Sequence, residues 1–205
     1  MRIRLKSRYV LYLLIVLILS GYGTRAFWLR GFANSLVCNG TAEKSDVILI
    51  ENLDTDYLLF QRAAQLRQSG MGKRVLVPVA TGADCNKPEL VDLKIAELMC
   101  ELARITDPVI MPVEKKEPIT LRLARQVAVR LQADGVRSVI IVTAGFRSHR
   151  AYMVYRKVLS PLGIRFSCLA VFGGHRPDNW TESLHSIEEV LEQFVKLQYY
   201  RWVVL

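Results

Sequence analysis

Two arginines, Arg147 and Arg150, follow an apolar, β-branched run at 138–142. The run predicts a buried strand that Gly145 ends, and Ser148 stands where it could cap a helix. In open α/β sheets, ligands bind beyond the carboxyl ends of the strands, and a helix N-terminus favours an anion. Because guanidinium groups bind phosphate and carboxylate through paired hydrogen bonds, this spacing indicates a site for an anionic ligand.

Acid–base chemistry has three candidates in the chain. Glu51 and Asp54 follow a predicted strand at 46–50, where a carboxylate could act as a base or bind a polar ligand. Asp54 and Asp56 equally suit the N-cap of the next helix. His149 lies beside the two arginines and could exchange protons near neutral pH, although no sequence neighbour pairs with it.

A further arginine, Arg122, stands in the first turn of a predicted helix at 119–132. The helix dipole disfavours a cation there, so the placement indicates a bound anion or a nearby carboxylate, for which Glu114 and Glu117 are candidates. The alternative is a solvated surface residue.

The elements that must position these groups alternate along the chain. Apolar runs predict strands at 46–50, 74–80, 109–113, 138–142 and 164–171. Amphipathic repeats predict helices at 57–68, 88–104, 119–132 and 147–159, and from residue 181 onward. Strands that alternate with helices of this length need right-handed crossovers. We therefore expect a three-layer α/β/α, Rossmann-like domain with a mainly parallel five-stranded sheet, spanning 46–205.

The N-terminus differs in character from the rest. Residues 1–8 form a basic tail, and 9–29 contain an uncharged apolar run followed by aromatic residues, which predicts a transmembrane anchor. A secretory signal cleaved after Gly23 is the alternative. The excess of cations before the run places the tail in the cytoplasm and the domain outside. Residues 30–45 read as a polar linker.

Charge and cysteine content narrow the partners. The net charge of +9 comes from 28 Lys and Arg against 19 Asp and Glu, without a basic block interleaved with aromatics, so nucleic acid is not an expected partner. The cysteines, Cys38, Cys85, Cys100 and Cys168, lack metal-ligand spacing, and no metal site is expected. In an oxidising compartment a disulfide is possible, but the pattern favours buried thiols at Cys100 and Cys168.

The order of these features resembles the ElyC/SanA/YdcF family over roughly residues 46–201. The family's spacing is kept by one set of residues around the third helix and the fourth strand: Glu114, Thr120, Ala124, Val142, Thr143, Arg150 and Ala151. The closing segment at 179–201 also resembles the family's C-terminal helix with its preceding Trp. A membrane anchor before such a domain is common in the envelope branch of the family.

The chain departs from the family pattern at polar positions. The family's Glu-Asn pair falls on Arg122 and Leu123, its His falls on Arg147, and its Gly-Gly falls on Glu51 and Asn52. Because guanidinium groups replace a carboxylate and an imidazole, a family-type reaction cannot simply be transferred to this chain.

Three functions remain open at this point. The first is a single-pass protein of the bacterial plasma membrane that binds an anionic small molecule or lipid-linked glycan precursor in polysaccharide or peptidoglycan biogenesis. Its ligand-binding residues would be Thr120, Arg122, Thr143, Arg147 and Arg150. The second is a hydrolase or transferase acting on a phosphorylated glycan intermediate, with Glu51, Asp54 or His149 as acid or base. The third is a membrane scaffold without catalysis. No cofactor is expected, since S-adenosylmethionine, which the family's cytoplasmic branch suggests, does not suit an external domain.

Overall fold

The computed structural model describes residues 2–53, 56–81, 88–114 and 116–205. Asp54, one of the acid–base candidates, lies outside the described residues, and so does Cys85.

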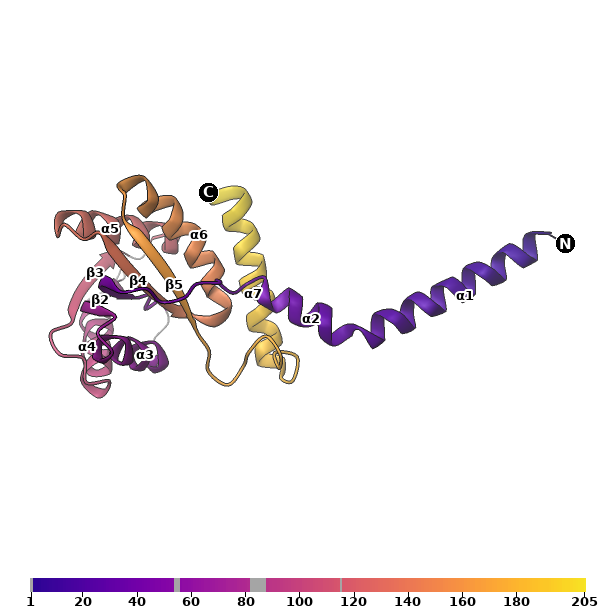
Figure 1. Cartoon of the computed structure of the whole chain (residues 1–205), viewed down its shortest axis with the longest axis horizontal. Coiled ribbons are helices and arrows are strands. Elements are labelled where there is room, and N and C mark those ends of the chain that lie inside the picture. Colours follow the sequence, from indigo (N-terminus) through magenta and orange to yellow (C-terminus); the bar gives the residue numbers. More distant parts are fainter. Residues whose placement is uncertain (1, 54–55, 82–87, 115) are drawn as a thin grey trace.

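The centre of the domain is a sheet of five parallel strands in the order β3-β2-β1-β4-β5 (Figure 1). The strands are β1 (Ser45–Ile50), β2 (Gly72–Thr81), β3 (Val109–Glu114), β4 (Ser138–Ala144) and β5 (Arg165–Val171). Helices α3 (Tyr57–Gln68) and α4 (Pro88–Leu102) cover one face, and α5 (Ile119–Ala133) and α6 (Ser148–Leu159) cover the other. The expected α/β class and parallel sheet are confirmed, and the architecture is consistent with a Rossmann-like fold.

The apolar strands are explained by burial on both faces. Within β1, Val47 and Leu49 pack with α5 and α6, while Ile48 and Ile50 pack with α3 and α4. All four side chains are nearly inaccessible to solvent. A parallel strand covered by helices on both sides must be apolar at successive positions, which is why these strands read as continuous apolar runs.

The C-terminal helix α7 (Leu184–Tyr199) begins three residues later than the sequence predicts. Ser183 caps it, because its side chain accepts a hydrogen bond from the Ser186 backbone N–H. A π-helical turn, η3 (Tyr200–Val204), follows α7 directly. This C-terminal unit packs beside α6 and joins the core through Tyr200.

The expected polar linker at 30–45 begins as a helix instead. Helix α2 (Arg25–Asn34) runs into the domain, where Phe32 and Ala33 pack with Trp180 and Phe194. The Trp180 indole N–H also donates a hydrogen bond to the Leu29 carbonyl at 3.2 Å. Local periodicity did not reveal this helix, because its apolar residues pack on positions about 150 residues away. Helix α2 is therefore packed against the domain.

A disulfide joins Cys38 to Cys168 in β5, with the two Cα atoms 6.2 Å apart. The expectation of a buried thiol was wrong for Cys168, whereas Cys100 is a buried free cysteine as expected. Beyond Cys38 the chain passes so close to β5 that a Cβ on Gly40 would clash with the Cys168 carbonyl oxygen. The disulfide and this close packing hold the segment around Cys38 against the edge strand β5.

Helix α1 (Arg2–Gly23) projects away from the domain (Figure 1). Its apolar side chains from Tyr9 to Leu19 are exposed. Among the described helices, none alone meets the length and hydropathy expected of a membrane span, but Tyr9–Gly23 and Arg25–Asn34 meet it as a pair bent by 58°.

At the amino edge of the sheet, Asp46 connects β1 to the start of β4. Its carboxylate accepts hydrogen bonds from the backbone N–H groups of Arg137 and Ser138 and from the Ser138 hydroxyl, at 3.0 to 3.1 Å. The Arg137 N–H and the Ser138 hydroxyl contribute most to lowering the pKa of Asp46 below its usual 3.8. The ionised form is therefore stabilised by folding.

We expect the Asp46→Asn variant to be less stable than the wild type above pH 3.8, because the variant lacks the charged acceptor. A lowered pKa in the folded state makes this contribution complete above the unfolded pKa and removes it as pH falls through the folded pKa. Chemical denaturation from pH 6 to pH 3 measures both proteins. The difference in unfolding free energy should shrink below about pH 4, and a difference independent of pH would contradict the assignment.

Candidate functional site

The candidate site lies where β1 and β4 end, side by side at the carboxyl edge of the sheet. Strand order reverses between these two strands, which is where ligands bind in open α/β sheets. Glu51 continues the pairing beyond β1, since its backbone N–H donates to the Val142 carbonyl at 2.9 Å. The Thr143 hydroxyl donates a hydrogen bond to the Glu51 carboxylate, and both side chains are fully buried.

Arg150 brings a positive charge to this buried carboxylate. Its side chain is nearly inaccessible, and burial lowers the pKa of its guanidinium group, while Glu51 acts in the opposite direction and Arg147 lowers the pKa further. Within the described chain, the Nε–H of Arg150 has no hydrogen-bond partner. Since buried donors are nearly always paired, this N–H is available for a ligand or an ordered water.

Tyr155 adds a phenol to the same polar cluster. The side chain is fully buried, and burial, followed by the charge of Glu51, raises the pKa of its hydroxyl well above 10.0. In the sequence, Tyr155 occupies an apolar position within the helix that is predicted at 147–159. Burial and the charge of Glu51 both favour the neutral form of this hydroxyl group.

A cavity of about 420 Å³ adjoins the cluster, and we call it the Arg150 cavity. It is lined by Leu53, Ala80, Glu117, Ile119, Thr120, Arg147, Arg150, Lys196, Tyr199 and Tyr200. Three of the five predicted ligand-binding residues therefore line one cavity, from the start of α5 and the start of α6. The helices that cover this sheet face deliver them to the carboxyl edge, as the crossover geometry requires.

Tyr200 closes the cavity on the side of the C-terminal unit. Its hydroxyl accepts a hydrogen bond from the Thr120 backbone N–H at 3.2 Å, and its ring lies 5.5 Å from the Arg150 guanidinium carbon. The second contact is a cation–π geometry, and it restricts the arginine to one side of the ring. Tyr200 therefore links both predicted segments of the site.

The other two predicted ligand-binding residues do not line the cavity. The Arg122 Nε–H donates a hydrogen bond to the Glu117 backbone carbonyl oxygen at 3.1 Å. Glu117 was one of the two predicted neighbours, but this contact uses its backbone and not its carboxylate. Thr143 is fully buried and holds Glu51. Thr143 supports the cavity from behind rather than contacting its contents.

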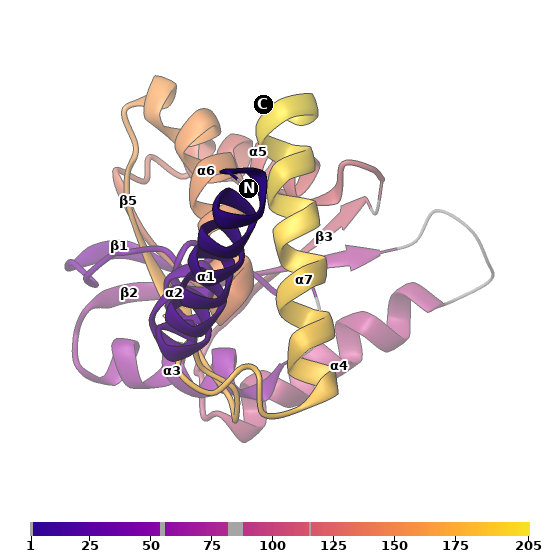
Figure 2. The ribbon, with the colours of Figure 1, turned by 90° about the vertical axis from the view of Figure 1, so that its right-hand side faces the viewer.

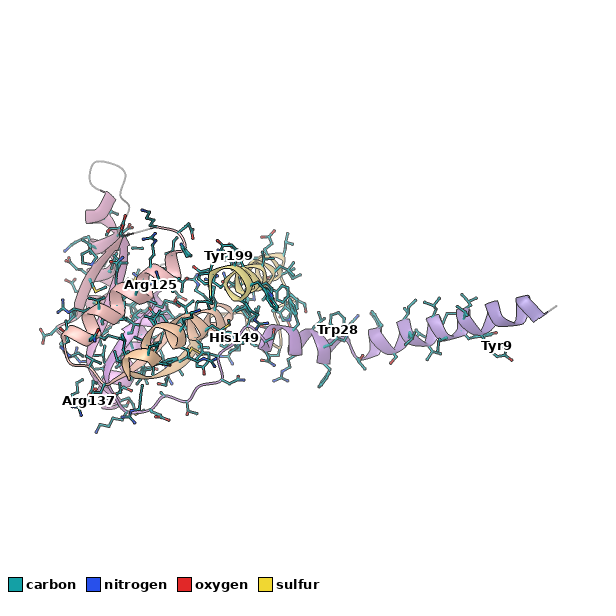
Figure 3. All side chains as sticks on the ribbon, turned by 90° about the horizontal axis from the view of Figure 1, so that it is seen from above. Tyr9, Trp28, Arg125, Arg137, His149 and Tyr199 are labelled. Carbon is teal, nitrogen blue, oxygen red and sulfur yellow. A yellow bond between two sulfur atoms is a disulfide. The ribbon has the colours of Figure 1, made fainter. Side chains whose placement is uncertain are left out.

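The acid–base candidates also lie elsewhere. Glu51 is fully buried and does not line the cavity. His149 contacts the Ser35 carbonyl oxygen through Nδ1 at 2.6 Å, and its backbone N–H donates to the Leu36 carbonyl. Figure 3 shows His149 on the side of the domain that α2 joins. These contacts join the start of α6 to Ser35 and Leu36, directly after α2.

Ser148 does not cap α6, contrary to the sequence-based expectation. It is the first residue of the helix, after the 3₁₀ turn η1 (Gly145–Arg147). Its hydroxyl donates to the Gly145 carbonyl at 2.6 Å and accepts from the Cys38 backbone N–H at 2.9 Å. The partner from the N-terminal segment explains why the local sequence did not reveal this role.

The sequence did not predict that the C-terminal unit contributes to the cavity. This unit supplies three lining residues, Lys196, Tyr199 and Tyr200. A signal was present, because residues 186, 190, 193, 197 and 200 are spaced by four and three and form the buried stripe of this unit. A Tyr that continues such a stripe has a buried ring and a hydroxyl that needs a partner. The spacing alone did not show that this partner is Thr120.

The electrostatics of the cavity wall favour anions. Arg147, Arg150 and Lys196 line it against one carboxylate, Glu117. Lys196 also pairs with Glu192 at 2.6 Å, on the exposed surface of α7. Within the described residues, no group of three or more His, Cys, Asp or Glu side chains is arranged to hold a metal ion. The arrangement offers hydrogen-bond donors and positive charge.

The fold and the site define an α/β protein with a parallel, Rossmann-like sheet and a basic cavity at its switch point. Comparison with protein-family models gave no match, and neither did comparison with curated proteins.

Proposed function

We propose that this protein binds a phosphate- or carboxylate-bearing ligand in the Arg150 cavity. The observation that carries the proposal is the convergence of Thr120, Arg147 and Arg150 on one cavity at the carboxyl edge of the sheet. The buried Nε–H of Arg150 has no hydrogen-bond partner among the described residues, and an anionic ligand would accept a hydrogen bond from it.

The energetics support an anion of modest size. Each hydrogen bond to a charged group contributes about 1.5 to 3 kcal/mol, and a guanidinium fork can make two in parallel. A volume of about 420 Å³ lies within the usual range of small-molecule pockets. A phosphorylated sugar or an acidic sugar residue of a glycan precursor matches this volume and charge.

We further propose that the domain is anchored in the plasma membrane and lies outside the cytoplasm. The exposed apolar side chains of α1 support an anchor, and the basic residues before them support a cytoplasmic N-terminus. The Cys38–Cys168 disulfide independently supports an oxidising compartment. With the resemblance to the ElyC/SanA/YdcF family, these features support a role in envelope polysaccharide or peptidoglycan biogenesis.

The test is a thermal-shift titration of the full chain in detergent micelles. The ligands are inorganic phosphate, pyrophosphate, a short-chain polyprenyl phosphate, a nucleotide sugar and a peptidoglycan fragment, at matched ionic strength. At 100 times its dissociation constant a ligand adds about 2.7 kcal/mol to stability, which raises the melting temperature measurably. We expect at least one anionic class to stabilise the wild type, and an uncharged sugar to have no effect.

The matched variants are Arg147→Gln and Arg125→Gln, which remove the same charge from different places. Arg147 lines the cavity, whereas Arg125 is exposed on α5 (Figure 3). The stabilisation should disappear with Arg147→Gln and persist with Arg125→Gln. Equal losses in both variants would show a general charge effect, and no stabilisation of the wild type by any ligand would overturn the proposal.

A further inference from the structure

The outer face of α7 and η3 carries a second apolar stripe. It consists of Leu184, Leu191, Val195, Tyr199 and Trp202, which are 71%, 49%, 65%, 50% and 79% exposed. Their spacings of seven, four, four and three residues place them on one side of a helix. Glu188 interrupts the stripe after Leu184, so its continuous part runs from Leu191 to Trp202.

This stripe is additional to the face that the helix already buries. Val190, Gln193 and Leu197 face the domain and are buried, on the side opposite the outer stripe. A helix with apolar residues on two opposite sides normally has both sides covered. The outer face is therefore an interaction surface rather than an ordinary solvated helix face.

The position of the stripe indicates what covers it. Figure 2 views the domain from the side on which α1 leaves, and α7 lies on that near side beside α1 and α2. Figure 1 shows α7 running across the direction of α1. A bilayer crossed by α1 would therefore lie roughly parallel to α7, on the side of the domain where α7 lies.

The attachment of α2 holds this arrangement together. Leu29 and Phe32 belong to the same apolar cluster as Phe194 of α7, and Trp180 is hydrogen-bonded to the Leu29 carbonyl. Helix α2 has ten residues and is about 15 Å long, so the domain cannot move far from the end of α1. A flexible linker would have allowed the domain to turn away, but this connection does not.

We infer that the outer face of α7 and η3 lies on the surface of a lipid bilayer. The inference rests on the membrane anchorage proposed above and adds a second attachment. The domain is then held flat against the membrane. The Arg150 cavity, which Lys196 and Tyr199 of the same helix line, lies at the level of the lipid headgroups.

The residues around the stripe favour an anionic lipid surface as its occupant. Phe27 and Trp28 are exposed on α2 and supply further aromatic side chains of the kind that gathers at membrane interfaces. Arg25 and Arg30 on α2 and Arg201 on η3 are exposed cations. An amphipathic helix with aromatic and cationic residues binds at the boundary between headgroups and acyl chains.

The test uses the full chain in proteoliposomes whose lipids carry bromine on the acyl chains, which quenches nearby tryptophans. Trp202→Phe and Trp28→Phe, compared with the wild type, report how strongly each indole is quenched. A control chain carries Val129→Trp with Trp202→Phe, because Val129 is exposed on α5, a helix that lies away from the side on which α1 leaves the domain. We expect Trp202 to be quenched several-fold more strongly than the indole introduced at position 129.

The outcomes separate this inference from the proposed anchor. Strong quenching of Trp28 with no excess quenching of Trp202 over the control would overturn the docking surface and leave the anchor standing. Absence of quenching at both positions would overturn the anchor as well. Ligand binding in the Arg150 cavity is measured separately, in micelles, and does not depend on either result.

A charged substitution tests the surface directly. Val195→Asp should reduce the quenching of Trp202 several-fold and leave the melting temperature in micelles unchanged, because the side chain is exposed. If Trp202 is instead unquenched, and the chain is a dimer that Val195→Asp converts to a monomer, the face joins two copies of this chain and the lipid assignment is wrong.

Discussion

Replacing Arg150 by Met is expected to lower the free energy of unfolding by about 3 kcal/mol, because it removes a nearly inaccessible cation that interacts electrostatically with the buried carboxylate of Glu51. Glu51 is fully inaccessible, and Arg150 is nearly so. The variant would remove a cation whose charge interacts with this carboxylate in a medium of low polarity. Equilibrium denaturation of the full chain in micelles measures the loss.

A double-mutant cycle with Glu51→Gln shows whether the charge pair is the cause. Gln keeps an oxygen that can accept the Thr143 hydrogen bond and removes the negative charge. We expect Arg150→Met to cost much less in the Glu51→Gln background, since the negative charge with which Arg150 interacts is then absent. Equal costs in both backgrounds would mean that Arg150 stabilises the fold through packing, for example on Tyr200, and that its charge is not required.

The same cycle separates stability from binding. The Glu51→Gln chain keeps both cavity arginines, so the anionic ligand that stabilises the wild type should still stabilise it. The same ligand should stabilise neither Arg150→Met nor the double variant. Loss of ligand stabilisation in Glu51→Gln alone would show that the carboxylate is needed to orient the arginines.

The second large effect is expected from the disulfide. Replacing both Cys38 and Cys168 by Ala should lower the free energy of unfolding by about 2 to 5 kcal/mol, because the bond closes a long loop and restricts the unfolded chain. The two cysteines are 130 residues apart in sequence. A reductant added to the wild type should produce a comparable fall in the melting temperature.

The double Ala variant serves as its own control, because the reductant should not change its melting temperature further. Cys100 is a buried free thiol, and burial raises its pKa to about 11, so it should react slowly with alkylating agents in the folded chain. If the wild type were insensitive to reductant, the bond would be absent from the protein, and nothing but the N-terminal charges would then support a domain outside the cytoplasm.

Much of the fold could be predicted because its signals are local. Residues 139–142 of β4 are apolar at successive positions, so both faces of the strand are apolar. The helix predicted at 57–68 has the same bounds in the structure. Asp56 caps that helix, as expected. Boundaries failed where a distant partner sets them, as at α2, whose apolar residues pack on the C-terminal unit.

The candidate site was predictable in part for the same reason. Arg147 and Arg150 follow a strand and begin a helix, and Thr120 begins the helix that crosses beside them, so topology alone brings these residues to one edge. Arg122 lies two residues after Thr120, which turns its side chain to another side of α5. His149 lies between the two arginines and faces α2 instead of the cavity.

By itself, the sequence determined the alternation of strands and helices, the parallel sheet and the edge at which cations gather, because these depend on periodicity within one element and on the handedness of short crossovers. Only the tertiary structure decided which groups meet there. Thr120 and Tyr200 are 80 residues apart, and Cys38 and Cys168 are 130 apart. Such pairs form because the packing of α2, α6 and the C-terminal unit brings distant backbone segments together, and no local spacing records that packing.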